Sequence, residues 1–222
     1  TNVNVHYIGA DGKEMSWSGA IGNFDIDPNE VSDTIWKYMK RKGWNNIAIA
    51  GLLGNIQQES AFNIAAKENG RDDGSATVLG SGFGLCQWTN TGGNSHGRRY
   101  NLFQYATKKG KEVTSIELQL DFILYGEGSD SVTAREYGKK NFSSVAEATE
   151  YFCMKWERPN VAMAHLNDVR IPAAQNFYEH YTSNSEFADI DADLEHVGDN
   201  ETDTSGDSEI AMANVSATNT ST

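Results

Sequence analysis

A glycine-rich stretch constrains the fold of this 222-residue chain more than any other feature, because it separates two regions of helical apolar periodicity. Residues 63–98 hold eight glycines among many Asn, Ser, Thr and Asp side chains. Glycine is a poor helix former, so we expect short strands, turns and an irregular loop here. Long ordered loops inside compact domains are usually functional, so this stretch is the first place to look for a site.

Apolar residues recur at helical spacing on both sides of this stretch. Upstream, the pattern predicts one helix from a cap at Asp27 to a stop at Gly43, and a second over about Asn45–Ala61. In the second helix, Gly51 and Gly54 indicate close backbone packing rather than solvent exposure. Downstream, four more helical segments are predicted, around residues 102–106, 115–126, 145–156 and 166–181.

Composition divides the chain into three parts. Residues 1–26 alternate apolar and polar side chains around a turn, which predicts a hairpin and a connector. Residues 27–182 are expected to form the folded domain, of α+β class and mainly α. Residues 183–222 are acidic and nearly free of aromatic side chains, which predicts a disordered linker leading to a further domain.

The net charge of −13 is concentrated at one end of the chain. Ten of the 31 acidic residues lie between Glu186 and Glu209, and no Lys or Arg follows Arg170. The body is therefore nearly neutral, which argues against a nucleic-acid partner, since phosphate binding needs clustered cations. No apolar run approaches the ~20 residues of a membrane span, so no membrane partner is expected.

The two cysteines, Cys86 and Cys153, allow one disulfide at most. Two buried free thiols and a single long-range bridge in a secreted protein both fit this count. Zinc-site spacings such as CxxC or HExxH do not occur, and the sequence implies neither a metal nor a cofactor.

Glu59 is the leading candidate for catalysis. It follows Leu52 by seven positions and Ile56 by three, which places it on the apolar face of the predicted second helix. A carboxyl group against apolar walls is desolvated and disfavours its charged form, as a general acid in glycoside cleavage requires. The alternative is a helix-terminal Glu with its carboxylate in water.

Five segments in order resemble the phage tail lysozyme family, part of the lysozyme-like superfamily with goose-type lysozymes and lytic transglycosylases. They are Ile47–Asn63 (IAIAGLLGNIQQESAFN), Gly82–Thr89 (GFGLCQWT), Gly97–Tyr100 (GRRY), Glu117–Phe122 (ELQLDF) and Trp156–Pro159 (WERP), within roughly residues 30–181. The resemblance implies a lysozyme-like fold whose glycine-rich β/loop insert forms the substrate cleft.

The resemblance also implies a function, a peptidoglycan glycan-strand hydrolase, secreted or exposed on a virion and joined to further domains. A muramidase cutting the β-1,4 bond between N-acetylmuramic acid and N-acetylglucosamine is the leading expectation. A lytic transglycosylase or a glucosaminidase remains open, as does a non-catalytic wall-binding or structural tail module.

Lysozyme chemistry needs a group opposite the acid, and the insert offers two carboxylates. Asp72 follows Glu59 by 13 positions and Asp73 by 14, and the goose-type pattern favours Asp72. Both could instead shape an exposed turn. Goose-type enzymes tend to have a second Asp where this chain has Thr89, a residue that could still position a water.

Other residues are expected to bind the sugar. Phe83 and Trp88 suit stacking on pyranose rings, although core packing is the alternative, and the amide of Gln87 suits N-acetyl groups. Arg98 suits the carboxylates of the peptide stem or the lactyl group. Glu157, in the WERP segment, is expected to be structural.

Overall fold

The computed structural model describes residues 3–8, 14–19, 28–68, 70, 72–160, 164–188 and 190. An antiparallel hairpin of β1 (Val3–Ile8) and β2 (Glu14–Gly19) comes first, with Val3 opposite Gly19 and Ile8 opposite Glu14. The α-helices are α1 (Pro28–Arg41), α2 (Asn46–Ser60), α3 (Arg98–Lys109), α4 (Ile116–Tyr125), α5 (Ser129–Lys139), α6 (Val145–Phe152), α7 (Ile171–Ser183) and α8 (Ser185–Ala188). Two π-helical turns are η1 (Cys153–Glu157) and η3 (Leu166–Arg170).

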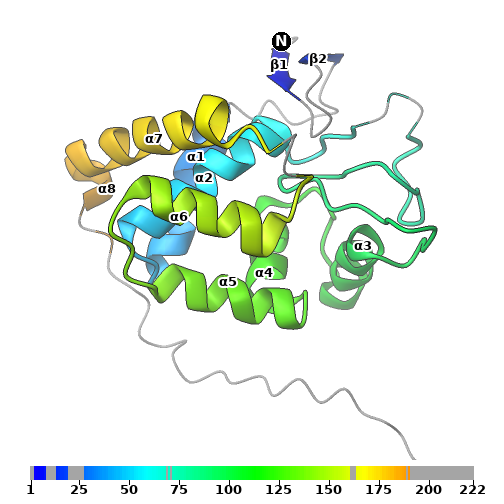
Figure 1. Ribbon diagram of the computed structural model, residues 1–222. Coiled ribbons are helices and arrows are strands. Elements are labelled where there is room, and N and C mark those ends of the chain that lie inside the picture. The colour runs from blue at the N-terminus through cyan, green and yellow to red at the C-terminus, as the bar shows by residue number, and fades with distance from the viewer. Residues whose placement is uncertain are drawn as a thin grey trace, which may run out of the picture.

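The expected mainly helical architecture is confirmed, and α2 lies at its centre (Figure 1). Its N-cap Asn45 accepts a hydrogen bond from the Ala48 amide at 2.9 Å. Most residues of α2 are buried, because α1, α5, α6 and α7 all pack on it. No helix in the described part of the chain is long and apolar enough to span a bilayer.

Gly51 and Gly54 let neighbouring helices approach α2 closely, as the sequence predicted. A Cβ atom on Gly51 would collide with the Tyr137 hydroxyl of α5. One on Gly54 would collide with the Arg170 carbonyl oxygen and lie 2.6 Å from Cβ of Ala174 in α7. The two glycines therefore fix the distance from α2 to α5 and to α7.

The folded body extends past the boundary expected at residue 182. Helix α8 follows α7 directly, and its Phe187 is buried against Tyr181, with ring centroids 4.8 Å apart. Lys37 of α1 pairs with Glu186 at 3.0 Å. The linker expected from residue 183 therefore starts no earlier than the end of α8, and residues 191–222 lie outside the described residues.

The glycine-rich insert between α2 and α3 lies to one side of the helical group (Figure 1). Its β character is not confirmed, since its described residues form only isolated bridges. These bridges are Lys67 with Phe83, Phe83 with Trp88, and Leu79 with Asn90. Side-chain hydrogen bonds, rather than a strand ladder, hold most of the insert.

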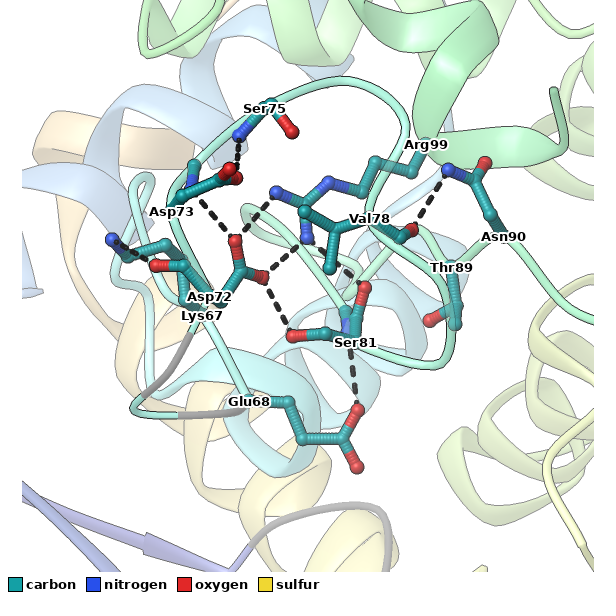
Figure 2. Close-up of polar contacts among 12 residues, drawn as sticks. Lys67, Glu68, Asp72, Asp73, Ser75, Val78, Ser81, Thr89, Asn90 and Arg99 are labelled. Carbon is teal, nitrogen blue, oxygen red and sulfur yellow. Dashed lines mark hydrogen bonds and ion pairs between the residues drawn. The ribbon is translucent and has the colours of Figure 1, made fainter. Parts of the chain in front are cut away.

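A buried ion pair between Asp72 and Arg99 is the main such contact (Figure 2). Arg99, from the first turn of α3, donates from Nη1 to Oδ2 at 2.5 Å and from Nη2 to Oδ1 at 2.9 Å. Ser81 Oγ and the Gly74 amide also donate to this carboxylate, each at 2.7 Å. Both side chains of the ion pair are 0% exposed.

Two buried amides hold the rest of the insert. Asn90 donates to the carbonyl oxygens of Ala76 and Val78 and accepts from the amide of Gly97 at the start of α3. Gln119 of α4 accepts from the Leu85 amide at 2.9 Å and donates to two loop carbonyls, those of Ile64 and Val113. The path of the insert is thus fixed by α3 and α4.

We expect Gly54→Ala to destabilise the fold by about 1–3 kcal/mol, because the added methyl group must push α7 away from α2. Urea denaturation followed by circular dichroism measures this change. Gly70→Ala is the control, since a Cβ atom there meets nothing within 4 Å. Equal denaturation midpoints for the two variants would contradict the packing described for α2.

We expect Asp72→Asn to destabilise the fold by about 3–5 kcal/mol, because it leaves the Arg99 guanidinium buried without its counter-charge. Asp73→Asn is the matched control. Asp73 is exposed and accepts local hydrogen bonds from the amide and the side chain of Ser75, which Asn can also accept. That control should unfold at the same urea concentration as the wild type.

The same ion pair predicts an acid-sensitive part of the stability. Burial opposes the charge on Asp72, but hydrogen bonds from Arg99, Ser81 and Gly74 outweigh it and lower its pKa to about 2. Because the pKa of Asp72 is lower in the folded state than in the unfolded state, the charged carboxylate stabilises the fold above about pH 3.8, the ordinary pKa. This stabilisation is lost as the pH falls toward 2. The stability gap between wild type and Asp72→Asn should therefore narrow over that range in urea titrations at successive pH values.

Candidate active site

A cleft of about 480 Å³ opens where the end of α2, the insert, the start of α3 and the end of η1 meet. Polar and charged side chains supply much of its lining. The lining residues are Glu59, Cys86, Gln87, Thr89, Thr91, Asn94, Gly97, Arg98, Glu157, Arg158 and Pro159. Four of the residues expected from the sequence to form the site therefore meet in one cleft: Glu59, Gln87, Thr89 and Arg98.

Glu59 lies in the last turn of α2, where the chain turns sharply out of the helix. Ala61 and Phe62 both have left-handed backbone conformations, with φ of 48° and 65°. Non-glycine residues adopt this conformation at a cost, so surrounding contacts must hold the turn. The Glu59 side chain lines the cleft while the residue is only 5% exposed, in agreement with its expected burial.

The surroundings of Glu59 are not purely apolar, contrary to expectation. Arg170 at the end of η3 donates from Nη2 to Glu59 Oε1 at 2.5 Å. The same guanidinium donates to the Ala164 carbonyl at 2.6 Å and to Asn55 Oδ1 at 2.9 Å. Arg170 is 0% exposed, so Glu59 has a buried counter-charge held in place by two further hydrogen bonds.

A second carboxyl group, Glu157, lies in the wall of the same cleft. It ends η1, just before Arg158, whose left-handed φ is 55°, and Pro159. Its Oε1 atom is buried and has no hydrogen-bonding partner among the described residues. Burial raises the pKa of Glu157 well above its ordinary value, and the negative charge of Glu59 adds to this rise. The sequence predicted a structural role for Glu157 and did not predict that it would line the cleft.

Gln87 and Thr89 form the insert side of the cleft. Gln87 has a φ of 48°, and its Nε2 donates to the Gly84 carbonyl at 2.9 Å and to the Ala66 carbonyl at 3.3 Å. Thr89 donates its hydroxyl hydrogen to the Gln87 carbonyl at 2.7 Å. The Thr89 oxygen keeps its acceptor capacity and can receive a hydrogen bond from a ligand or a water.

Arg98 lines the cleft, but its guanidinium is already engaged. It donates to both oxygens of Glu127, at 2.8 and 3.1 Å, and stacks over Trp156 at 4.3 Å. Arg158 pairs with Asp130 at 2.7 Å but leaves 47% of its side chain exposed. Of these two cations of the cleft wall, Arg158 is the more accessible to a substrate carboxylate.

Phe83 and Trp88 do not line the cleft. Trp88 is 0% exposed and packs edge-on against Phe122 and Trp156. Phe83 is buried against Phe103, with ring centroids 5.0 Å apart. Sugar stacking by either ring has no support from this arrangement, because both rings are buried in the protein core.

Asp72 also lies apart from the cleft lining. All its hydrogen bonds go to the insert and to Arg99, as Figure 2 shows. The prediction that Asp72 faces Glu59 as the second catalytic group therefore gains no support from the geometry. Asp73 is exposed and likewise does not line the cleft.

The two cysteines are buried free thiols, which settles the alternative that the sequence left open. Burial raises the pKa of Cys153 to about 11 and that of Cys86 well above its ordinary value. Within the described part of the chain, no group of three or more His, Cys, Asp or Glu side chains could hold a metal ion.

Arg170 and Glu157 are the site residues that the sequence did not reveal. Arg170 is separated from Glu59 by 111 positions, so no local spacing connects them. Glu157 belongs to the WERP segment, but a Glu at the end of a helix in a charged segment is equally typical of an exposed surface residue. The burial of its Oε1 atom in the cleft wall is the property that distinguishes it, and spacing alone does not predict that burial.

The amino-acid sequence is similar to those of known proteins. The chain is 30% identical over 132 residues to Morphogenesis protein 1 of Bacillus phage B103. The aligned stretch covers 56% of this chain and 33% of that protein, so the chain spans only about a third of the relative's length. Residues 30–181 match the phage tail lysozyme family. This match covers more than half of the chain and includes every residue that lines the cleft, so the chain belongs to the phage tail lysozyme family.

Proposed function

We propose that this domain cleaves the glycan strands of bacterial peptidoglycan as a lysozyme-type hydrolase. The bond cut is the β-1,4 link between N-acetylmuramic acid and N-acetylglucosamine, and Glu59 protonates the leaving oxygen. The observation that carries the proposal is the position of Glu59, which ends a buried helix and lines a polar cleft within a lysozyme family domain. Its relative is a phage protein, which supports a virion-associated or wall-facing location.

The cleft supports this chemistry through groups of three kinds. Glu59 and Glu157 supply carboxyl groups. Thr89 offers a hydroxyl oxygen that can orient a water near the sugar. Arg158 presents a partly exposed guanidinium that suits the carboxylates of muramic acid and of the peptide stem. No step requires a cofactor.

A lytic transglycosylase is the second candidate, and one observation favours it. Asp72, the carboxylate expected to activate a water, is committed to Arg99 and Ser81 instead. Without a carboxylate base, the acetamido group and the 6-hydroxyl of the substrate can close an anhydro ring in place of hydrolysis. A glucosaminidase would leave N-acetylglucosamine at the reducing end.

Mass spectrometry of the products from purified cell walls distinguishes these activities. A muramidase releases fragments with reducing muramic acid ends, whereas a transglycosylase releases anhydro ends that are one water lighter. We expect reducing muramic acid. Exclusive anhydro ends would establish the second candidate, and intact walls after incubation would indicate a binding or structural module.

Glu59→Gln should lower the rate of cell-wall clearing by about 10²–10⁴-fold, the typical contribution of a general acid. The Gln side chain keeps an oxygen that can accept from Arg170 but removes the counter-charge of this buried guanidinium, so we expect a loss of stability. Rates are therefore compared at a temperature at which circular dichroism shows both proteins folded. Glu150→Gln is the control, since it removes one negative charge from an exposed position on α6. A folded Glu59→Gln variant that clears walls like the wild type would exclude Glu59 as the acid.

A further inference from the structure

Glu157 differs from the other carboxyl groups around the cleft in its partners. Glu59 is paired with Arg170, Glu127 with Arg98, and Asp130 with Arg158. Oε1 of Glu157 is buried with no partner in the described part of the structure. Leaving a buried charge without a cation or hydrogen bonds is costly, so such a carboxyl group tends to keep its proton.

Some of the charged groups around Glu157 favour its ionised form and others disfavour it. Glu59 of α2 and Glu127, which precedes α5, disfavour its ionisation, while Arg98 of α3 and Arg170 of η3 favour it. Both guanidiniums are already neutralised, Arg98 by Glu127 and Arg170 by Glu59. The neighbouring thiols of Cys86 and Cys153 are buried and free. Burial and the two carboxylates therefore outweigh the cations, and the pKa of Glu157 is raised.

Glu59, in contrast, has a counter-charge at hydrogen-bonding distance. A carboxylate that accepts a 2.5 Å hydrogen bond from a buried guanidinium can act as an acid only after it receives a proton. When two carboxyl groups on one cleft have unlike surroundings, the group whose surroundings disfavour its charge keeps its proton and the other stays ionised. In this cleft, Glu157 has the surroundings of the storing group.

Building on the function proposed above, we propose that Glu157 is the resting site of the catalytic proton and recharges Glu59, which carries the proton to the glycosidic oxygen. In one turnover the bond from the anomeric carbon to the leaving oxygen breaks, and that oxygen takes the proton. Water adds its hydroxyl to the anomeric carbon. The remaining proton of the water returns to the pair of carboxyl groups, so the enzyme ends unchanged. Glu157 is thus a positioning residue that acts through Glu59.

The pH dependence of kcat/KM for cell-wall cleavage tests the storage role. In the wild type, activity should fall as pH rises through the deprotonation of Glu157, whose pKa is raised above the ordinary value of a Glu. In Glu157→Gln, this fall should move to lower pH by about one unit or more, because the group that stores the proton is gone. The exposed Glu150→Gln should reproduce the wild-type profile.

A second measurement does not depend on activity. Carbon-13 NMR of chain labelled at the Glu side-chain carboxyl carbons follows each titration, and the Glu157→Gln spectrum identifies the Glu157 signal. We expect Glu157 to titrate above the ordinary value of about 4.3, and to titrate lower in Glu59→Gln, where the nearby negative charge is gone. This dependence would establish that the two carboxyl groups are electrostatically coupled, and the pH profile of cleavage then decides whether the coupling serves catalysis.

The outcomes separate this inference from the proposed function. An unshifted pH profile in a folded Glu157→Gln variant, or an ordinary titration of Glu157, overturns the storage role even if the walls are cleaved. If the wild type leaves cell walls and their fragments intact, the proposed function fails and the delivery step fails with it. In that case the NMR titration still decides whether Glu157 holds a proton in the cleft.

Discussion

The ion pair between Arg170 and Glu59 is the contact on which both the fold and the cleft depend. It joins the end of α2 to the turn that starts α7, and Arg170 also reaches Asn55 one turn earlier in α2. Gly54 allows this approach, because the Arg170 carbonyl lies where a Cβ atom would be. A helix–helix contact made of glycine, arginine and two polar side chains thus sets the position of Glu59 in the cleft. The buried cation is tolerated because each of its nitrogen atoms has an acceptor in protein.

Carboxylates in this domain serve two different purposes, and their partners distinguish them. Asp72 accepts hydrogen bonds from Arg99, Ser81 and the Gly74 amide, which leaves little capacity for a substrate or a water. Its contribution is to fold the insert against α3, so that Gln87 and Thr89 reach the cleft. Glu59 and Glu157 have fewer partners and line the cleft itself. A carboxylate whose oxygens already accept several hydrogen bonds from the protein is therefore best read as structural, and its sequence position is a poorer guide.

Regular apolar spacing made most of the helices predictable, and the same spacing placed Glu59 on a buried face. Helix α5 was missed because three of its four buried positions, Ser131, Ala134 and Gly138, are small, and Tyr137 alone does not make an apolar stripe. Phe83 and Trp88 were assigned to sugar binding because composition cannot tell a core aromatic from an exposed one. Arg170 could not be paired with Glu59, since helix packing joins residues 111 positions apart in a way that local spacing does not encode.

Among the described side chains that line the cleft, Glu157 has a buried oxygen, Oε1, without a hydrogen-bonding partner. Its position at the end of η1 bears on why a carboxyl group is found there. A purely structural helix end is usually satisfied by a cation or by backbone amides, and Arg158 beside it makes that kind of contact with Asp130. A glutamine at 157 would fill the same space without the desolvation penalty of a potential charge. The presence of a carboxyl group there is explained if its proton is used, and among the nearby charges Glu59 does most to lower its tendency to ionise. Its surroundings keep the proton on Glu157, and the ion-paired Glu59 needs a proton before it can act as an acid. Transfer of the proton from Glu157 to Glu59 accounts for both properties.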